Sequence, residues 1–137
     1  MSEILLAVNG TLMRGLELEG NMTRVGARFL REAKTEPFYR LWSIDDIHPA
    51  MLRVGAEDER RVSVELEVWE VPAVGLADIL AGEPAGLGIG KVKLLGGETV
   101  LGVIAEPELV KGQKEISSFG GWRNYLKKKP ADVVKVS

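Results

Sequence analysis

An apolar run that ends in a polar, glycine-bracketed turn is the feature that most limits how this chain can fold. Residues 4–8 are Ile-Leu-Leu-Ala-Val, and residues 8–15 are Val-Asn-Gly-Thr-Leu-Met-Arg-Gly. A short apolar run is typical of a strand buried in a sheet. A turn at the end of such a strand can direct several backbone N–H groups into one hollow, which favours a small anion. The sequence predicts a small-molecule pocket here, although Asn-Gly also makes tight turns that bind nothing.

The rest of the chain alternates further short strands with few helical segments. Alternating apolar residues predict half-buried strands at residues 38–44 and 62–71, the latter with Glu65, Glu67 and Trp69 on the more exposed face opposite its apolar residues. Two strand-like runs around Gly-Gly, at residues 90–94 and 99–104, predict a hairpin.

Two segments have helical features. Between Pro72 and Pro84 the apolar spacing is helical, and a second short helix is expected between Ser117 and Leu126, with a serine as its cap. We therefore predict an α+β fold, a small mixed β-barrel of about six strands with one or two short helices packed outside it.

Composition narrows the class of protein. The chain has 137 residues, 28% charged residues and a formal net charge of −2, which fits one globular domain. We expect this domain to cover residues 1–126, followed by a basic tail at residues 127–137 that contains three consecutive lysines. Because acidic residues balance the basic ones, and no basic stretch is interleaved with aromatic residues, we expect no nucleic-acid partner.

Cofactors and location are constrained by residues that are rare or missing. The chain has no cysteine and one histidine, so disulfides, iron–sulfur clusters and a structural metal site are not expected, and we predict no cofactor. The N-terminal apolar run is too short for a signal peptide, and no stretch is long enough to span a membrane. These features predict a cytoplasmic protein with no membrane partner. They leave open whether it forms a homo-oligomer.

Three segments resemble the gamma-glutamylcyclotransferase-like (AIG2-like) family. Residues 8–15 resemble the Tyr-Gly-Ser/Thr-Leu loop that follows the first strand in that family. Residues 65–71 resemble its Gly-x-x-Tyr-x-Val strand, and residues 80–84 its Leu-Asp-x-x-Glu-Gly segment. The resemblance implies a mixed barrel-like fold, and it places Glu83 on the family's catalytic glutamate.

A resemblance to the C-terminal domain of allophanate hydrolase covers almost the whole chain. It is carried by residues 8–15, 39–44, 48–51, 90–92 and 119–123. In that family an amidase domain removes ammonia from allophanate, and the C-terminal domain is held to decarboxylate the resulting N-carboxycarbamate. The amidase machinery is not found in this chain. The resemblance therefore implies a small anionic substrate and a separately encoded amidase as partner.

Two departures from the cyclotransferase pattern favour the allophanate hydrolase branch. Asn9 stands where cyclotransferases usually have tyrosine, and residues 84–89 replace a tyrosine and an arginine that shape the amino-acid pocket. Both changes argue against gamma-glutamyl substrates.

The residues also suggest a chemistry for this substrate. Backbone N–H groups of the loop formed by Asn9, Gly10, Thr11 and Leu12 could clamp one carboxylate, and Arg14 or Arg40 could neutralise the other. Loss of CO2 also needs a proton for the nitrogen. Histidine ordinarily exchanges protons near neutral pH, and burial would help a glutamate to hold one, so His48 and Glu83 are the predicted catalytic residues.

Each assignment has a simpler alternative. His48 could be a turn residue bonded to a nearby carboxylate, Glu83 could be solvated, and the two arginines could form surface ion pairs. We also expect Gly10 to adopt a positive φ, so that Gly10→Val would abolish stabilisation by small anions such as malonate.

Three functions remain open from the sequence. The first is decarboxylation of a small dicarboxylate of the allophanate pathway. The second is a cyclotransferase-like release of an amine from an aminoacyl substrate, with Glu83 as base. The third is a module without catalytic activity that binds a small anion or an amidase.

Overall fold

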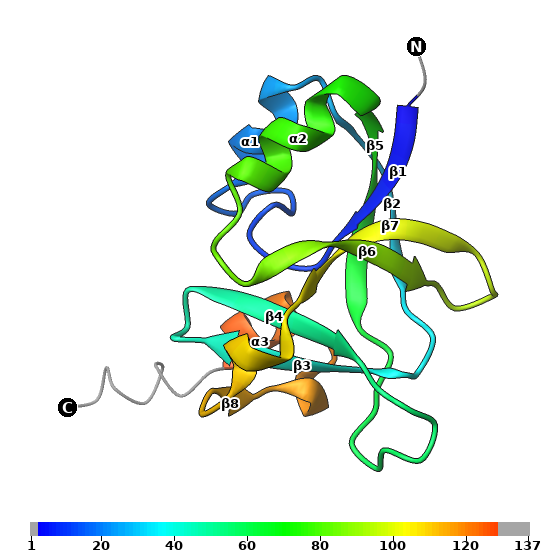
Figure 1. Ribbon diagram of the computed structural model, residues 1–137, viewed down its shortest axis with the longest axis vertical. Coiled ribbons are helices and arrows are strands. Elements are labelled where there is room, and N and C mark those ends of the chain that lie inside the picture. Colours follow the sequence, from blue (N-terminus) through cyan, green and yellow to red (C-terminus); the bar gives the residue numbers. More distant parts are fainter. Residues whose placement is uncertain (1–2, 129–137) are drawn as a thin grey trace.

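The computed structural model describes residues 3–128, which form a mixed α+β fold. The strands and α-helices follow one another in this order (Figure 1): β1 (Glu3–Val8), α1 (Glu19–Arg24), β2 (Arg28–Lys34), β3 (Tyr39–Ile44), β4 (His48–Arg53), β5 (Glu65–Pro72), α2 (Leu76–Ala81), β6 (Leu87–Lys93), β7 (Thr99–Ala105), β8 (Lys114–Glu115) and α3 (Trp122–Lys128).

The strands form one large and one small sheet. The larger sheet has the order β2-β5-β1-β7-β6, in which β1 is antiparallel to β5 and parallel to β7. It curls so far that an isolated bridge joins Thr35, just beyond β2, to Leu94, just beyond β6. The smaller sheet has the order β4-β3-β8. The predicted fold class is confirmed, and in the described residues the outer strands of the larger sheet meet at that single bridge.

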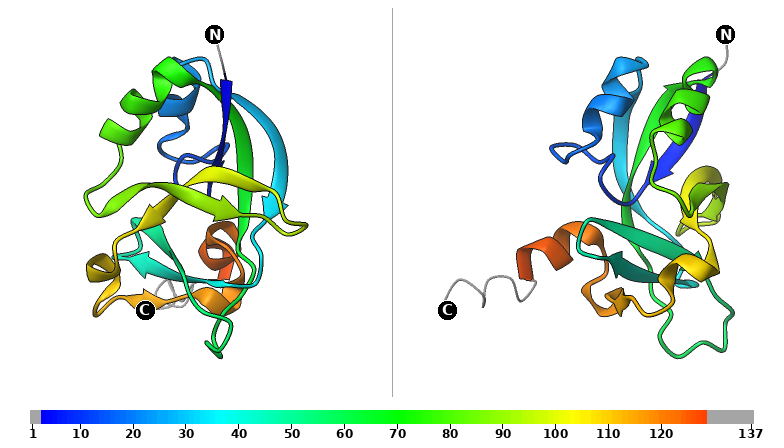
Figure 2. Two further views of the ribbon diagram at one scale, coloured as in Figure 1. Left: turned by 45° about the vertical axis from the view of Figure 1, so that its right-hand side comes forward. Right: turned by 60° about the vertical axis from the view of Figure 1, so that its left-hand side comes forward.

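The helices lie at opposite ends of the molecule. Helices α1 and α2 contact each other at the end where β1 begins, whereas α3 lies beside the small sheet (Figures 1 and 2). Helix α2 is where the apolar spacing predicts it, and Ile79 anchors it in the core. None of the helices within residues 3–128 is long and apolar enough to cross a membrane.

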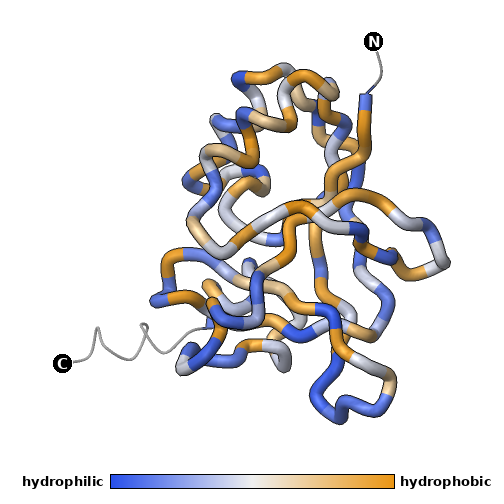
Figure 3. The backbone as a smooth tube through the Cα atoms, in the orientation of Figure 1, coloured by the Kyte–Doolittle hydropathy of each residue, from blue (hydrophilic) through white to orange (hydrophobic). Residues whose placement is uncertain are grey.

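The core runs through the larger sheet, and it reaches both faces of β5. Apolar segments follow the strands through the middle of the molecule, while the loop between β4 and β5 is hydrophilic (Figure 3). Leu66 and Val68 are buried, as expected, but Glu67 and Trp69 on the opposite face are also only 2% exposed. The prediction of a half-exposed strand is therefore wrong at these two positions, because the loop after β1 and helix α3 cover that face.

Several elements differ from the prediction. The hairpin of β6 and β7 is confirmed, but α1, β2, β4 and β8 were not predicted, and the described residues form eight strands where about six were expected. The C-terminal helix is interrupted: a 3-10 turn at Ser117–Phe119 ends at Gly120 in the left-handed conformation, and α3 begins at Trp122. The first two lysines of the predicted basic tail belong to α3, and residues 129–137 lie outside the described residues.

Candidate functional site

The loop after β1 folds into a tight turn with unpaired backbone donors. The N–H of Met13 donates to the carbonyl of Gly10 at 3.0 Å, and this bond closes a turn whose central residues are Thr11 and Leu12. In such a turn the central N–H groups have no partner within the turn. Within residues 3–128, the N–H groups of Gly10, Thr11 and Leu12 donate to no protein group. Three successive free donors give this loop the character of an anion-binding nest.

Gly10 is required here by a close contact rather than by its φ. A Cβ at this position would lie 2.5 Å from Cδ of Pro49. Gly10 is not among the glycines with positive φ, so that expectation is wrong. The loop packs directly on the proline ring at the start of β4, and this packing brings the loop and β4 to the same cavity.

Gly10→Ala is expected to lower the free energy of unfolding by about 1–3 kcal/mol, because the added methyl group overpacks the Pro49 ring. Urea-induced unfolding measures the effect. Gly20→Ala is the matched control, since nothing lies within 4 Å of a Cβ there and the residue is in helix α1. That variant should be as stable as the wild type or slightly more stable. Equal losses in both variants would contradict the packing described here.

A small cavity lies between this loop, the start of β4 and the end of α2. It is lined by residues 8–12, His48, Pro49, Glu83, Leu87 and Val103. The structure therefore brings together six of the eight predicted site residues. The cavity volume is about 10 Å³, room for roughly one water molecule.

Glu83 is a half-buried residue with one buried carboxyl oxygen. It follows the last turn of α2, and its N–H donates to the carbonyl of Leu80 at 3.1 Å. Its Oε2 is buried and has no hydrogen-bond partner within residues 3–128. Burial without a compensating cation raises the pKa of Glu83 to about 7. Glu83 can therefore hold a proton at neutral pH, unlike an ordinary glutamate.

The raised pKa of Glu83 predicts a pH-dependent cost to stability. A carboxyl whose pKa is higher in the folded state stabilises the fold below its unfolded pKa, and this contribution is lost as the pH rises through the folded pKa of about 7. Relative to Glu83→Gln, the wild type should lose about 2–3 kcal/mol of unfolding free energy between pH 5 and pH 8.5. Urea unfolding at the two pH values measures it. Glu108→Gln, at a side chain that is 79% exposed, should show no such difference.

His48 is buried and held in a defined tautomer. Its side chain is 6% exposed, and Nδ1 lies 3.0 Å from the carbonyl oxygen of Pro49. Because a carbonyl oxygen can only accept, Nδ1 must carry the proton of this bond. This leaves Nε2 as the ring nitrogen that can exchange a proton with a bound molecule. The bond is to a main-chain carbonyl and not to the nearby carboxylate that a simple turn residue would use.

The side chain of Asn9 supports the cavity from the sheet side. Asn9 is 4% exposed, and its Nδ2 donates to the carbonyl of Val103 in β7 at 3.0 Å. This bond ties the start of the loop to the strand parallel to β1. The side chain therefore positions the loop, and the backbone donors remain free to face an anion.

The two predicted arginines lie outside the cavity. Arg14 donates to Glu67 and Glu32, and Arg40 donates to Glu115 and Asp58. The hydrogen bond from Arg40 is the largest cause that holds the pKa of Glu115 at about 2. Both guanidinium groups are thus engaged in ion pairs, and a role in substrate binding would require them to leave these partners.

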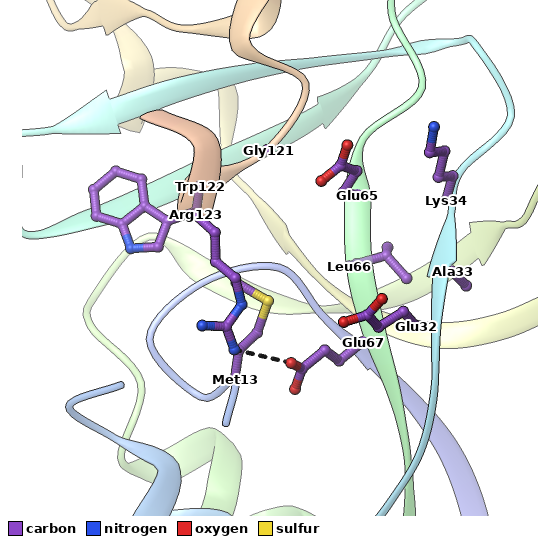
Figure 4. Close-up of a pocket in the computed structure, with 10 residues that line it drawn as sticks. All are labelled: Met13, Glu32, Ala33, Lys34, Glu65, Leu66, Glu67, Gly121, Trp122 and Arg123. Carbon is purple, nitrogen blue, oxygen red and sulfur yellow. Dashed lines mark hydrogen bonds and ion pairs between the residues drawn. The ribbon is translucent and has the colours of Figure 1, made fainter. Parts of the chain in front are cut away.

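A larger hollow of about 410 Å³ borders the loop at Met13 and shares no lining residue with the small cavity. Met13, Glu65, Leu66, Glu67 and Arg123 are among the residues around it, and Lys34 extends from the neighbouring strand (Figure 4). This hollow could not be predicted from the sequence, because its walls come from four separate segments. No group of three or more His, Asp or Glu side chains within residues 3–128 is placed to hold a metal ion.

Known structures define the fold class first. An AIG2-like protein from Mus musculus matches with a TM-score of 0.62 and 20% identity, covering 85% of this chain and 88% of that protein. A uropathogenic E. coli-specific protein matches with a TM-score of 0.89 and 52% identity, covering 93% of this chain and 98% of its own. The fold is therefore that of the AIG2-like, gamma-glutamylcyclotransferase-like proteins.

The family follows from the sequence match. Residues 4–127 match the allophanate hydrolase C-terminal domain, and the chain belongs to that family. Urea amidolyase from Lachancea kluyveri is 34% identical over 139 residues, which cover 95% of this chain. The chain spans 8% of the length of that curated relative.

Proposed function

We propose that this protein decarboxylates a small dicarboxylate of urea and allophanate breakdown, with N-carboxycarbamate as the substrate. The observation that carries the proposal is Glu83, whose buried Oε2 has no hydrogen-bond partner within residues 3–128, in the same cavity as the three free backbone donors of the loop. Such a cavity offers a proton and an anion-binding surface at one place. Membership in the allophanate hydrolase C-terminal domain family supports this substrate class.

The loop supplies the carboxylate clamp. The free N–H groups of Gly10, Thr11 and Leu12 hold the carboxylate that stays on the substrate. Backbone donors suit this role because the turn and the contact with Pro49 fix them before substrate arrives. No arginine lines the cavity within the described residues. We assign the compensation of negative charge to these dipoles and to the two protonatable side chains.

The proton comes from Glu83 and His48. In the reaction, the bond between the nitrogen and one carboxyl carbon breaks, its electron pair stays on the nitrogen, and CO2 leaves. The nitrogen takes a proton from Glu83, which leaves carbamate as the second product. Since its pKa is about 7, Glu83 can hold this proton at neutral pH. Nε2 of His48 acts as the second proton carrier and returns a proton to the site.

Substrate entry requires the cavity to open. A volume of about 10 Å³ is too small for a dicarboxylate. The segment at residues 82–87 is the wall that we expect to move, because it follows the end of α2 and contains Gly86 at a φ of 90°. Opening there would also let water reach Glu83, and closure over the substrate would remove that water again.

Release of CO2 tests the function. The protein is added to an amidase that produces N-carboxycarbamate from allophanate, and CO2 is followed with and without it. The expected result is faster CO2 release that is proportional to the concentration of this protein. Release at the rate of the amidase alone would contradict the proposal. It would favour the third function, a module without catalytic activity that binds a small anion or an amidase.

A further inference from the structure

Glu67 carries a buried carboxylate, and the residue contacts the site loop where the loop begins and where it ends. In the register of β1 and β5 it pairs with Val8, the last residue before the loop. Its side chain then accepts hydrogen bonds from Arg14, where the loop leaves the cavity. One residue of β5 thus contacts the chain where the loop begins and where it ends.

The carboxylate of Glu67 accepts four hydrogen bonds, two at each oxygen. Oε1 accepts from the backbone N–H of Arg14 and from Nε1 of Trp69, each at 3.0 Å. Oε2 accepts from Nε of Arg14 at 3.0 Å and from Nη2 of Arg123 at 2.9 Å. Burial by itself raises the pKa of Glu67, but these hydrogen bonds outweigh it and the pKa lies below its usual value.

Arg123 completes the contact from a distant part of the chain. It comes from the first turn of α3, and its Nη2 also donates to the main-chain carbonyl of Arg14 at 2.6 Å. Both backbone polar groups of Arg14 are therefore bound by this cluster. The Arg14 guanidinium is held on another side by the ring of Phe29, whose centroid lies 3.6 Å away. In Figure 4, Arg123 extends from α3 across the hollow to Glu67.

A buried carboxylate stabilises a strand less efficiently than an apolar side chain, because burying its charge costs desolvation free energy. An apolar side chain at position 67 would gain the burial without the cost of desolvating a charge, as neighbouring Leu66 and Val68 do. The carboxylate adds directional hydrogen bonds. Four donors from three segments must meet at its two oxygen atoms, which fixes the positions of those segments relative to one another. The geometry of the loop, rather than the stability of β5, accounts for a glutamate here.

We propose that Glu67, with Arg123, is a positioning residue that holds the loop at residues 9–14 in the conformation the anion site requires. It lines the larger hollow and not the small cavity of the proposed anion site, so it touches no substrate there. This inference rests on the proposed function only for the identity of the anion. The fixing of the loop itself can be measured without turnover.

The test combines amide hydrogen exchange with malonate binding in the full chain. Exchange is measured at Met13, Leu16 and Leu18, whose N–H groups bond within the loop, and at Val92 and Val100 in the β6–β7 hairpin as references. In Glu67→Gln the loop amides should exchange at least about tenfold faster relative to the reference amides, because an amide presents an N–H to one pair of donors. The dissociation constant for malonate should rise about tenfold as well.

Two further variants make the result decisive. Glu115→Gln removes a second arginine-bound carboxylate of low exposure, 17%, and should leave the loop amides and malonate binding unchanged. Arg123→Met keeps Glu67 bound to Arg14 and Trp69, at a side chain that is 38% exposed, and should loosen the loop even if Glu67→Gln does not fold. Loop amides that stay as protected as in the wild type, or that accelerate only as much as Val92 and Val100, would overturn the proposal.

The two proposals fail in different ways. If wild-type protein does not bind malonate, the proposed function loses support, and exchange at the loop amides still decides whether Glu67 positions the loop. If wild-type protein binds malonate but Glu67→Gln and Arg123→Met bind it equally well with a protected loop, the anion site stands and the positioning role falls.

Discussion

Glu83→Gln is expected to lower the decarboxylation of N-carboxycarbamate by about a hundredfold or more, as for the loss of a general acid. Glutamine keeps the shape of the side chain but has no acidic proton to give. In the wild type, the rate should fall on the alkaline side as Glu83 ionises with a pKa of about 7. That limb should vanish in the variant. A pH–rate profile of CO2 release in both proteins measures these two effects together.

The control for this experiment is an exposed glutamate of the same chain. Glu108→Gln changes a side chain that is 79% exposed, outside the cavity, and should retain full activity and the same alkaline limb. Full activity in Glu83→Gln would contradict a role as proton donor. Loss in that variant, combined with turnover of an aminoacyl substrate by the wild type, would favour the cyclotransferase-like chemistry.

His48→Asn is expected to reduce the same activity by about a hundredfold with a stability change of about 1 kcal/mol or less. The asparagine amide can still donate to the Pro49 carbonyl from a position near Nδ1, so the bond that holds the start of β4 is retained. What is lost is Nε2. Steady-state kinetics and urea unfolding on one preparation separate the two effects. An active variant, or one that is inactive because it is unfolded, would contradict this assignment.

The strands that were predicted correctly are those whose burial is visible in local sequence. The apolar run of β1 and the Gly-Gly turn between β6 and β7 depend on neighbouring residues alone. Strand β2 was missed because it is an outer strand in which charged residues dominate, with mostly exposed positions. Strand β4 was missed because it begins with His48 and a proline, which are typical of a turn.

The parts of the site that consist of short sequence motifs could be predicted. The parts that depend on contacts between residues far apart in the chain could not. The loop and Glu83 were found through motifs, and they do line one cavity. The partners of Arg14 were not found, because Glu67 and Arg123 lie 53 and 109 residues away from it in the chain. Alternation placed Glu67 on a solvent-facing side, and only the packed loop and α3 make that side part of the interior.

The state of the Glu83 carboxyl is the most direct test of the account. With ¹³C-labelled glutamate, the side-chain carboxyl resonance of Glu83 is assigned by comparison with Glu83→Gln and followed as the pH is changed. We expect a midpoint near the pKa of about 7 and a shift of this resonance when malonate is added. A midpoint at 4.5, the ordinary pKa of a glutamate side chain, and no response to malonate would contradict this assignment.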